Sequence, residues 1–351
     1  MIYHNFKVRV VGNGFGEYRA EVLDSSAGES ISGFPTPDPL QITALRSKLA
    51  ANPSEAAVQA LGILLFETLF TGHVLLNLRR AIAQAEFEKA ALRIQLAIEP
   101  NELSALPWEL LFDPETKQFL ALSNHTTLVR YLPTPEALRP LLAIAPPLRI
   151  LALFPSSMDM PPIDIEHERY VMNEALQSLT NRGLVELLFL EHATAEEMLK
   201  ALRERQVHIL YYQGHVGFNS YASANYLLLE DGAGNASGQG MMELSYMLRD
   251  SIVRLAVINS CGMAAGTLAY DLVRHGVPGA IAIQEPLRDI ETITFLQNFS
   301  QALAIGLPVD AAVAEGRRAI WAMSGPQGYW ASPILVVRQQ DAALFSLKER
   351  P

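Results

Sequence analysis

Residues 208–213 read HILYYQ, a short run of mostly apolar and aromatic side chains that ends at Gly214-His215. Four similar runs follow or precede it: RILALF at 149–154, VELLFL at 185–190, LAVINS at 255–260 and AIAIQ at 280–284. Continuous apolar runs of this length are typical of strands buried on both faces, as in parallel sheets. The five runs therefore predict an α/β fold built on a mostly parallel sheet.

Helical stretches between most of these strands indicate how both faces of the sheet are covered. Their expected ranges are about 163–180, 194–205, 264–275, 289–304 and 309–323. Thr194 and Glu197 have the spacing of a capping box, which starts the second of these helices. Strands that alternate with helices imply right-handed crossovers. The stretch between 214 and 254 departs from this rhythm, with a Gly-rich loop, an edge-like strand at YLLLE (226–230) and a short helix.

A smaller α/β region precedes this sheet. FKVRVV (6–11) and YRAEVL (18–23) alternate apolar and polar residues around Gly12-Asn13-Gly14, which predicts a β-hairpin. Three helices are expected near 40–51, 54–70 and 73–89, the middle one capped at Asn52 before Pro53. The strictly alternating LRIQLAI (92–98) predicts a half-buried strand.

The segment after this strand leads toward a domain boundary. LPWELLFDPE (106–115) suggests a short helix, in which Trp108 packs and Glu109 is a first-turn acid. FLALS (119–123) and TTLVRYL (126–132) are expected strands. The proline-rich PTPEALRPLLAIAPP (133–147) is the best candidate for a linker. We therefore expect an N-terminal α/β region at 1–140 that packs on a larger domain at 141–351.

Composition limits the partners of this 351-residue chain. Its 27 Lys and Arg against 37 Asp and Glu give a net charge of −10, which disfavours nucleic acid and anionic membranes as partners. We find no signal peptide, and the apolar run at 141–154 is too interrupted to span a bilayer. The single cysteine excludes an internal disulfide, and no spacing of His, Cys, Asp and Glu suggests a metal site. A soluble, reducing, cytoplasmic setting without a cofactor is expected.

Two reactive side chains follow predicted strands at the same edge of the sheet. His215 follows HILYYQ, and Cys261 follows LAVINS and opens a helical stretch. The positive end of a helix favours a thiolate, and an adjacent imidazole can serve as its base. Backbone N–H groups of Val216, Gly217 and Cys261 are candidate donors to an oxyanion, with Gly217 leaving room for a substrate backbone. Taken alone, a strand-end cysteine is usually a small core hydrophobe, and a histidine in a Gly-flanked loop is usually a turn residue.

A family resemblance points to the same pair. Over about residues 90–337 the chain resembles the CHAT family of caspase-like cysteine peptidases, which are relatives of separase in peptidase clan CD. The segments that carry this resemblance are LPWELLFDPE, FLALS, YYQGHVG (211–217), LLLEDG (227–232), LAVINSCGMAAG (255–266), GVPGAIAIQ (276–284), FLQNFSQALAIGLPVDAAVAEGRRAI (295–320) and WASPIL (330–335). The resemblance implies a caspase-like sheet and a dyad of His215 and Cys261 that cleaves peptide bonds. The family usually has glycine directly after the histidine, where this chain has Val216, which questions the oxyanion geometry.

The resemblance also implies a substrate protein, a partner and a specificity pocket. We expect a regulated peptidase that acts on a protein. A partner protein, or self-association, is expected to order the mouth loop PSSMDMPPID (155–164) and so activate it. Asp289, with Glu285 nearby, is the candidate that selects a basic residue before the cut bond. Asp289 also suits the cap of a helix beginning at Ile290, and an inward Arg288 would instead favour an acidic residue.

Two other functions remain open on the sequence. A catalytically silent interaction or scaffold module would keep the fold and the two side chains without turnover. A nucleotide-binding domain is suggested only by the Gly-rich segments GNGFG (12–16) and DGAGNASGQG (231–240), neither of which lies between a strand and a helix with a following Lys or acid. His208 is the first residue of the predicted strand HILYYQ, seven residues before His215, and we expect it to have a core role.

Overall fold

The computed structural model describes residues 2–12, 17–35, 37–51, 54–134, 138–219, 224–260, 264–339 and 342–347. Contacts divide the chain into two compact units. The first unit consists of Met1–Tyr131 with Val313–Ala331, and the second of Leu132–Ala312 with Ser332–Pro351. Among the described residues no single helix is long and apolar enough to cross a membrane, although one pair bent by 107° meets that test in length and composition.

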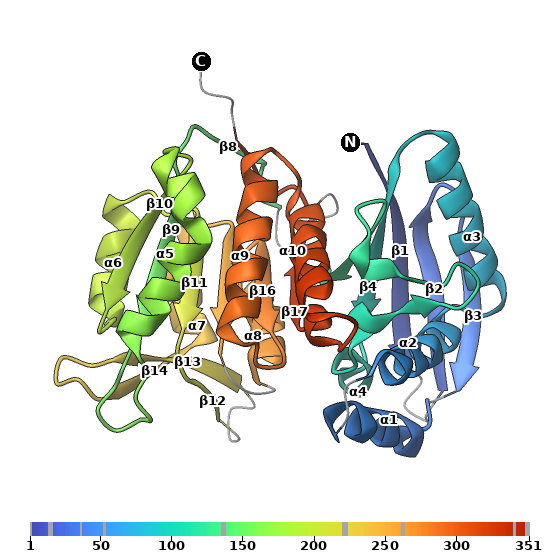
Figure 1. Ribbon diagram of the computed structural model, residues 1–351, viewed down its shortest axis with the longest axis horizontal. Coiled ribbons are helices and arrows are strands. Elements are labelled where there is room, and N and C mark those ends of the chain that lie inside the picture. The colour runs from blue at the N-terminus through green and yellow to red at the C-terminus, as the bar shows by residue number, and fades with distance from the viewer. Residues whose placement is uncertain are drawn as a thin grey trace. The chain divides into compact units, whose positions relative to one another are not determined.

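The second unit contains the sheet that the sequence predicts (Figure 1). Its strands lie in the order β10, β9, β11, β15, β16, β17. The first five are parallel and the last is antiparallel to its neighbour. Their bounds are β9 Leu148–Phe154, β10 Val185–Glu191, β11 Ile209–Gln213, β15 Leu255–Asn259, β16 Gly279–Ile283 and β17 Pro333–Val337. The predicted mostly parallel sheet is therefore confirmed.

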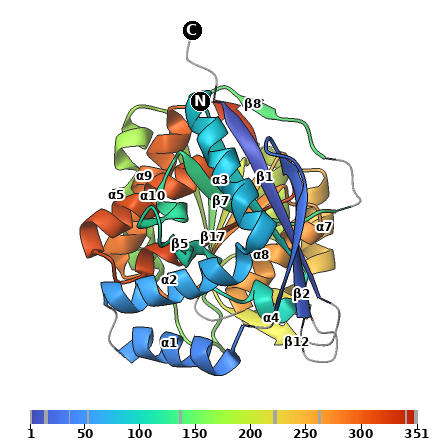
Figure 2. The same ribbon diagram turned by 90° about the vertical axis from the view of Figure 1, so that its right-hand side faces the viewer.

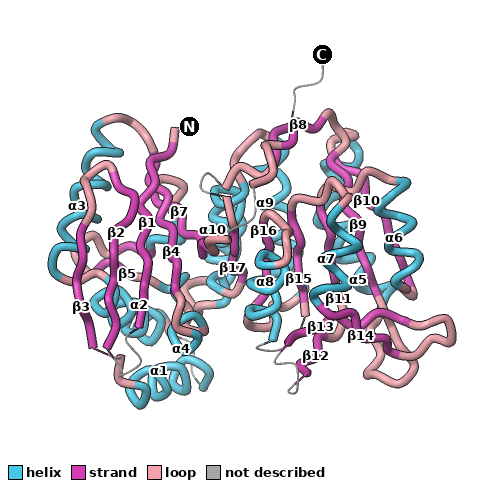
Figure 3. Tube along the Cα trace, turned by 180° about the vertical axis from the view of Figure 1, so that it is seen from behind, coloured by secondary structure: helices cyan, strands magenta, loops and turns pink. Residues whose placement is uncertain are grey.

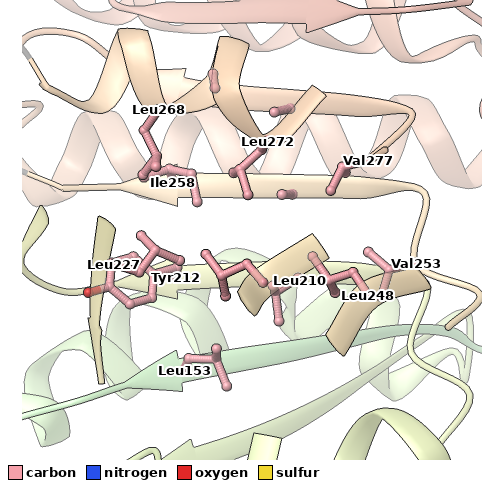
Figure 4. Packing of buried hydrophobic residues seen from close by; sticks show 14 of the residues in the cluster. Leu153, Leu210, Tyr212, Leu227, Leu248, Val253, Ile258, Leu268, Leu272 and Val277 are labelled. Carbon is pink, nitrogen blue, oxygen red and sulfur yellow. The ribbon is translucent and has the colours of Figure 1, made fainter. Parts of the chain in front are cut away.

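Helices cover both faces of this sheet because alternate residues of the strands are apolar on each side. One face packs on α5 (Ile165–Asn181) and α9 (Asp289–Ala304), which lie side by side in front of the sheet in Figure 1. The other face forms a buried cluster with α6 (Ala195–Glu204), α7 (Met241–Arg249) and α8 (Ala264–Arg274). Figure 4 shows Leu210 and Tyr212 of β11 and Ile258 of β15 with Leu268 and Leu272 of α8 in this cluster. The helix ranges predicted from the sequence are confirmed, as is the capping box of Thr194 and Glu197.

A three-stranded antiparallel sheet stands at the carboxyl end of β11, as Figures 1 and 3 show from opposite sides. It consists of β12 (Val216–Asn219), β13 (Ala224–Glu230) and β14 (Ala236–Gly240), in that order. The expectation of an edge strand at YLLLE is wrong, because β13 is the central strand and pairs on both sides. The predicted linker contains β8 (Leu142–Ile144), which pairs with β18 (Phe345–Leu347).

The first unit has its own strands in the order β7, β4, β1, β2, β3. The predicted hairpin is confirmed by β1 (Tyr3–Gly12) and β2 (Glu17–Ser25), while β3 (Ser30–Pro35) was not predicted. The three predicted helices are present as α1 (Pro39–Ala51), α2 (Glu55–Leu69) and α3 (Gly72–Phe87). Figure 2 shows α3 running across the strands of this unit. The helix N-cap of α2 is Ser54, whose side chain accepts from the N–H of Ala57, so the expected cap at Asn52 is wrong.

Two further expectations fail in this unit. All eight residues of β4 (Ala91–Ile98) are buried, so the strand is not half-exposed, and the guanidinium of Arg93 lies over the ring of Tyr3. FLALS forms only the short β6 (Gln118–Phe119) and a 3-10 turn at Leu120–Leu122. The remaining elements are α4 (Asn101–Ser104), a 3-10 turn at Trp108–Leu110, β5 (Phe112–Asp113), β7 (Thr126–Tyr131), a 3-10 turn at Tyr329–Ala331, and α10 (Val309–Ser324), in which the division between the units falls.

Glu109 is the acid in the Trp108–Leu110 turn, and it does more than begin a helix. Its carboxylate accepts from Arg130 at 3.0 and 2.6 Å and lies 3.9 Å from Arg317. All three side chains are about 1% exposed. Burial lowers the pKa of Arg317 to about 10. The first unit therefore contains a buried charged cluster, which hydrophobic patterning did not reveal.

Candidate active site

The two strands that carry the predicted dyad are neighbours. β11 and β15 pair in parallel, and their last register pair is Gln213 with Asn259. His215 and Cys261 each come two residues after this pair. Cys261 itself lies outside the described residues, and the helix α8 begins at Ala264, three residues after it. The fold thus ends β11 and β15, the strands that precede His215 and Cys261 in the sequence, at one edge of the sheet.

The imidazole of His215 has a fixed hydrogen-bond partner. Its Nε2 lies 2.8 Å from the carbonyl oxygen of Pro161. Because a carbonyl oxygen only accepts, Nε2 carries the proton in this contact. In the neutral ring Nδ1 is then the nitrogen with the free lone pair. The side chain is partly exposed, so Nδ1 belongs to an imidazole that is oriented but not enclosed.

The backbone of His215 is held as firmly as its ring. Its carbonyl oxygen accepts from the hydroxyl of Tyr212 at 2.6 Å and from the N–H of Leu228 at 3.1 Å. Burial raises the pKa of Tyr212 far above its ordinary value, which keeps the hydroxyl protonated as a donor. The same phenol explains Gly214, since a Cβ there would lie 2.4 Å from the Tyr212 hydroxyl. Tyr212 therefore fixes the turn from β11 into His215.

Val216 and Gly217, the predicted oxyanion donors, lie in β12. Val216 pairs with Leu227, and Gly217 with Tyr226. A Cβ on Gly217 would lie 2.1 Å from the Tyr226 ring. The room that glycine leaves is filled by Tyr226, so the expectation that a substrate backbone approaches there is wrong. Val216 has an extended strand backbone, which any residue adopts, so valine after the histidine imposes no strain.

The candidate specificity residues occupy different surroundings. Asp289 lies 2.9 Å from Nε2 of His167, and this carboxylate raises the pKa of His167. The helix α9 begins at Asp289 and its N-cap is Arg288, so the expected cap role of Asp289 is wrong. Arg288 turns back to Glu291 at 2.6 Å. Glu285 is exposed, and its backbone exchanges hydrogen bonds with the hydroxyl of Ser332.

Four side chains beside the predicted site form two hydrogen-bonded pairs that were not anticipated from the sequence. Glu168 of α5 is half-buried and accepts from Nε2 of Gln213 at 3.1 Å. Burial raises the pKa of the Glu168 carboxyl. Tyr211, beneath them on β11, accepts from the side-chain amide of Asn259 at 3.0 Å. The only sequence signal for Glu168 was its place in a helical first turn, which is also where acids stabilise helices without any other role.

His208 and the Gly-rich segment 231–240 have structural roles. His208 is buried, its Nδ1 accepts from the N–H of Arg149 at 2.9 Å, and burial lowers its pKa to about 4. In DGAGNASGQG, Asp231 accepts from the N–H groups of Ala233 and Asn235 to form the turn before β14. GNGFG lies mostly outside the described residues. Within the part of the chain that the structure describes, no group of three His, Cys, Asp or Glu side chains is placed to hold a metal ion.

Comparison with known proteins places the chain in a family. The profile of the CHAT domain matches residues 59–338. The chain belongs to the CHAT domain family. This membership agrees with the caspase-like sheet, covered by helices on both faces, that was expected from the sequence. No curated protein matches this CHAT chain.

Solved structures of cysteine peptidases are similar to the CHAT chain at low identity. Gingipain R (RgpB), described as an Arg-specific cysteine proteinase, is 12% identical with a TM-score of 0.43, over 74% of this chain and 67% of that chain. The Porphyromonas gingivalis complex of RgpB pro- and mature domains is 12% identical with a TM-score of 0.43, over 84% and 71%. Separase in the Saccharomyces cerevisiae separase–securin complex is 14% identical with a TM-score of 0.44, over 91% of this chain and 21% of that chain.

Proposed function

We propose that this CHAT protein is a cysteine endopeptidase in which Cys261 is the nucleophile and His215 its base. The observation that supports this most is the hydrogen bond from Nε2 of His215 to Pro161, because it leaves Nδ1 as the basic nitrogen. The equal offset of His215 and Cys261 from the Gln213–Asn259 pair supports it further. Segments that leave adjacent parallel strands at the same level start about 4.8 Å apart.

The proposed reaction is amide hydrolysis in two stages. The Cys261 sulfur attacks the substrate carbonyl carbon while Nδ1 of His215 holds the thiol proton, and the proton then passes to the leaving amine. Water, deprotonated by the same nitrogen, attacks the thioester and releases the carboxylic acid and free Cys261. The positive end of α8, which begins at Ala264, favours the thiolate.

Of the two strand N–H groups, Val216 suits the oxyanion better than Gly217. The N–H of Leu228 bonds to the carbonyl of His215, and the register pairs Val216 with Leu227. In an antiparallel ladder this makes Val216 a non-hydrogen-bonded position and directs the N–H of Gly217 toward Tyr226. The N–H of Val216 then faces away from β13. We propose it as one oxyanion donor and the N–H of Cys261 as the second.

We further propose that the protease cuts after a basic residue of a protein substrate. Asp289 and Glu168 stand at the carboxyl edge of the sheet, and Glu285 lies beyond the end of β16 on the same side. The side-chain oxygen of Gln213 is buried without a hydrogen-bond partner. A guanidinium supplies several donors to such acceptors, and a wrong substrate leaves them unpaired at a cost of about 1–3 kcal/mol.

A peptide library read by mass spectrometry tests this specificity. We expect Arg or Lys before the cut, with the preference reduced by Glu168→Gln and by Asp289→Asn. His167→Ala frees the Asp289 carboxylate from its present partner and should strengthen the preference. Acidic or apolar residues before the cut, unaffected by these variants, would refute the basic specificity while leaving the dyad standing.

Control by a partner protein is part of the proposal. The loop 155–164 was expected to await such a partner, but the chain itself already binds it at several backbone groups, described below. We therefore propose that a partner acts on a loop that is already placed. Activity of the purified chain that is unchanged by dilution or by cell extract would argue against a partner.

The dyad is tested by the alkylation of Cys261, the chain's single cysteine. Iodoacetamide should react with it near pH 7 faster than with a free thiol, and His215→Ala should slow the reaction. His275→Ala is a matched control, since its Nδ1 lies 2.8 Å from the carbonyl oxygen of Asp271 in the preceding helix α8. Slow labelling that ignores His215→Ala would favour a silent interaction or scaffold module.

A further inference from the structure

The loop between β9 and α5, residues 155–164, is attached to the hairpin formed by β13 and β14. The N–H of Ser156 donates to the carboxylate of Glu230 at 2.7 Å. The N–H of Met158 donates to the carbonyl of Gly234 at 2.9 Å. In the opposite direction, the N–H of Ala236 donates to the carboxylate of Asp159 at 2.7 Å. Three contacts therefore join the first half of the loop to one end of the hairpin.

Glu230 is the buried anchor among these contacts. Only 5% of this residue is exposed, although it carries a carboxylate at the last position of β13. Its own N–H donates to the carbonyl of Ala193 at 2.8 Å, and Nδ1 of His192 lies 3.3 Å from its carboxylate. A buried carboxylate is costly unless hydrogen bonds satisfy it. Glu230 therefore cannot move without losing partners on both sides.

The second half of the loop presents the Pro161 carbonyl to His215. The N–H of Met160 donates to the carbonyl of Ser157 at 3.2 Å, and the N–H of Ile163 to the hydroxyl of Ser156 at 3.4 Å. Pro161 precedes another proline, which restricts its backbone to extended conformations and so limits where its carbonyl points. The direction of that carbonyl depends on where the anchored first half lies.

We propose that Asp159 and Glu230 are positioning residues for His215. They hold the loop so that the Pro161 carbonyl oxygen accepts a hydrogen bond from Nε2–H of His215. This hydrogen bond keeps Nδ1 unprotonated and fixes the orientation of the ring. The catalytic consequence rests on the proposed peptidase function, whereas the effect on the imidazole does not. The β13–β14 hairpin thus sets the tautomer and the orientation of the His215 imidazole through the loop.

The imidazole is observed directly by NMR of protein labelled with ¹⁵N-histidine. In the wild type, neutral His215 should be mainly the Nε2–H tautomer. Asp159→Ala should raise the Nδ1–H fraction severalfold, because it removes the acceptor for Ala236. Asp159→Asn retains an acceptor oxygen and should restore the wild-type spectrum. Because Asp159 is exposed, these variants test the proposal even where the buried Glu230→Gln fails to fold.

Kinetics give the second readout. Asp159→Ala should lower kcat/KM and the alkylation rate of Cys261 by roughly tenfold, mainly through kcat, as expected for a displaced base. Glu243→Gln, an exposed first-turn acid of α7, is the matched control and should change neither the spectrum nor the rate. An unchanged His215 tautomer in Asp159→Ala overturns the positioning role, whatever the enzyme does. A changed tautomer in a chain that cleaves no peptide upholds it and overturns the peptidase function instead.

Discussion

Gln213 and Asn259 are the last paired residues of two adjacent parallel strands, and both reach the same cluster at the sheet edge. Gln213 donates to Glu168 at 3.1 Å, and Asn259 donates to the hydroxyl of Tyr211 at 3.0 Å. Burial raises the pKa of both Glu168 and Tyr211. The two strands therefore end in two hydrogen-bonded pairs, and the Glu168 charge also acts on Tyr211. In the sequence, His215 and Cys261 each follow two residues later.

Gly217 should tolerate no side chain. Its Cβ in alanine would lie 2.1 Å from the Tyr226 ring, so Gly217→Ala must displace that ring or β12. We expect the free energy of unfolding to fall by roughly 1–3 kcal/mol, the usual cost of overpacking. Chemical denaturation measures the change. Gly232→Ala is the control, because nothing lies within 4 Å of the added atom.

Removing the ring that blocks this position should reverse the effect. In the double variant Gly217→Ala with Tyr226→Ala, the methyl group no longer meets the ring, so the two changes should cost less together than the sum of each alone. Strict additivity would show that the two residues do not contact each other, contrary to the structure.

Acid should destabilise the protein through His208. Burial, with Arg149 and Arg254 nearby, lowers the pKa of His208 to about 4, below the value of 6.5 in an unfolded chain. Between these values the unfolded state binds more protons than the folded state, so stability is complete above pH 6.5 and falls as the pH drops toward 4. This pKa shift corresponds to a loss of roughly 3 kcal/mol in the free energy of unfolding as the pH falls from 6.5 to 4.

His208→Asn isolates this contribution. Asparagine keeps an acceptor for the N–H of Arg149 but does not titrate. When the free energy of unfolding is measured at several pH values, His208→Asn should lose less stability between pH 6.5 and 4 than the wild type. Equal losses in both proteins would mean that His208 is not the titrating group.

The Glu109 cluster should be far more sensitive to loss of its carboxylate than an exposed ion pair of the same unit. Glu109→Gln leaves Arg130 and Arg317 buried without this carboxylate, and breaking a buried pair commonly costs about 3–5 kcal/mol. Glu115→Gln is the matched change at a carboxylate that is 77% exposed and lies 3.1 Å from Arg79, and it should cost under about 1 kcal/mol. Similar melting shifts for the two variants would contradict the importance of burial.

Sequence patterns predicted the parts of the fold that depend on burial along one element. The five apolar runs became strands because both faces of a parallel sheet are covered, and Thr194 with Glu197 capped α6 through purely local contacts. The family resemblance, carried by the segments around His215 and Cys261, was confirmed as membership of the CHAT family.

Features that depend on distant partners were not predicted. YLLLE became a central strand because β12 and β14 pair with it, and β3 exists because β2 offers an edge. The roles of Glu168, Glu230 and Pro161 require residues far apart in sequence to meet. Gly217 looked like room for a substrate because nothing near it in sequence announced that the Tyr226 ring fills that room.

The measurement that tests the central claim most directly is a map of new protein termini in cells that produce this chain. Wild type, Cys261→Ala and His215→Ala are compared. Glu243→Gln, which is expected to leave the His215 spectrum unchanged, is the control that keeps the dyad. The dyad predicts a small set of new N-termini, preceded in the substrate by Arg or Lys, that appear with wild type and Glu243→Gln and are lost in both dyad variants. Appearance of the same termini with Cys261→Ala would contradict a His215/Cys261 peptidase. So would the absence of new termini with wild type, together with a Cys261 alkylation rate that is unchanged by His215→Ala.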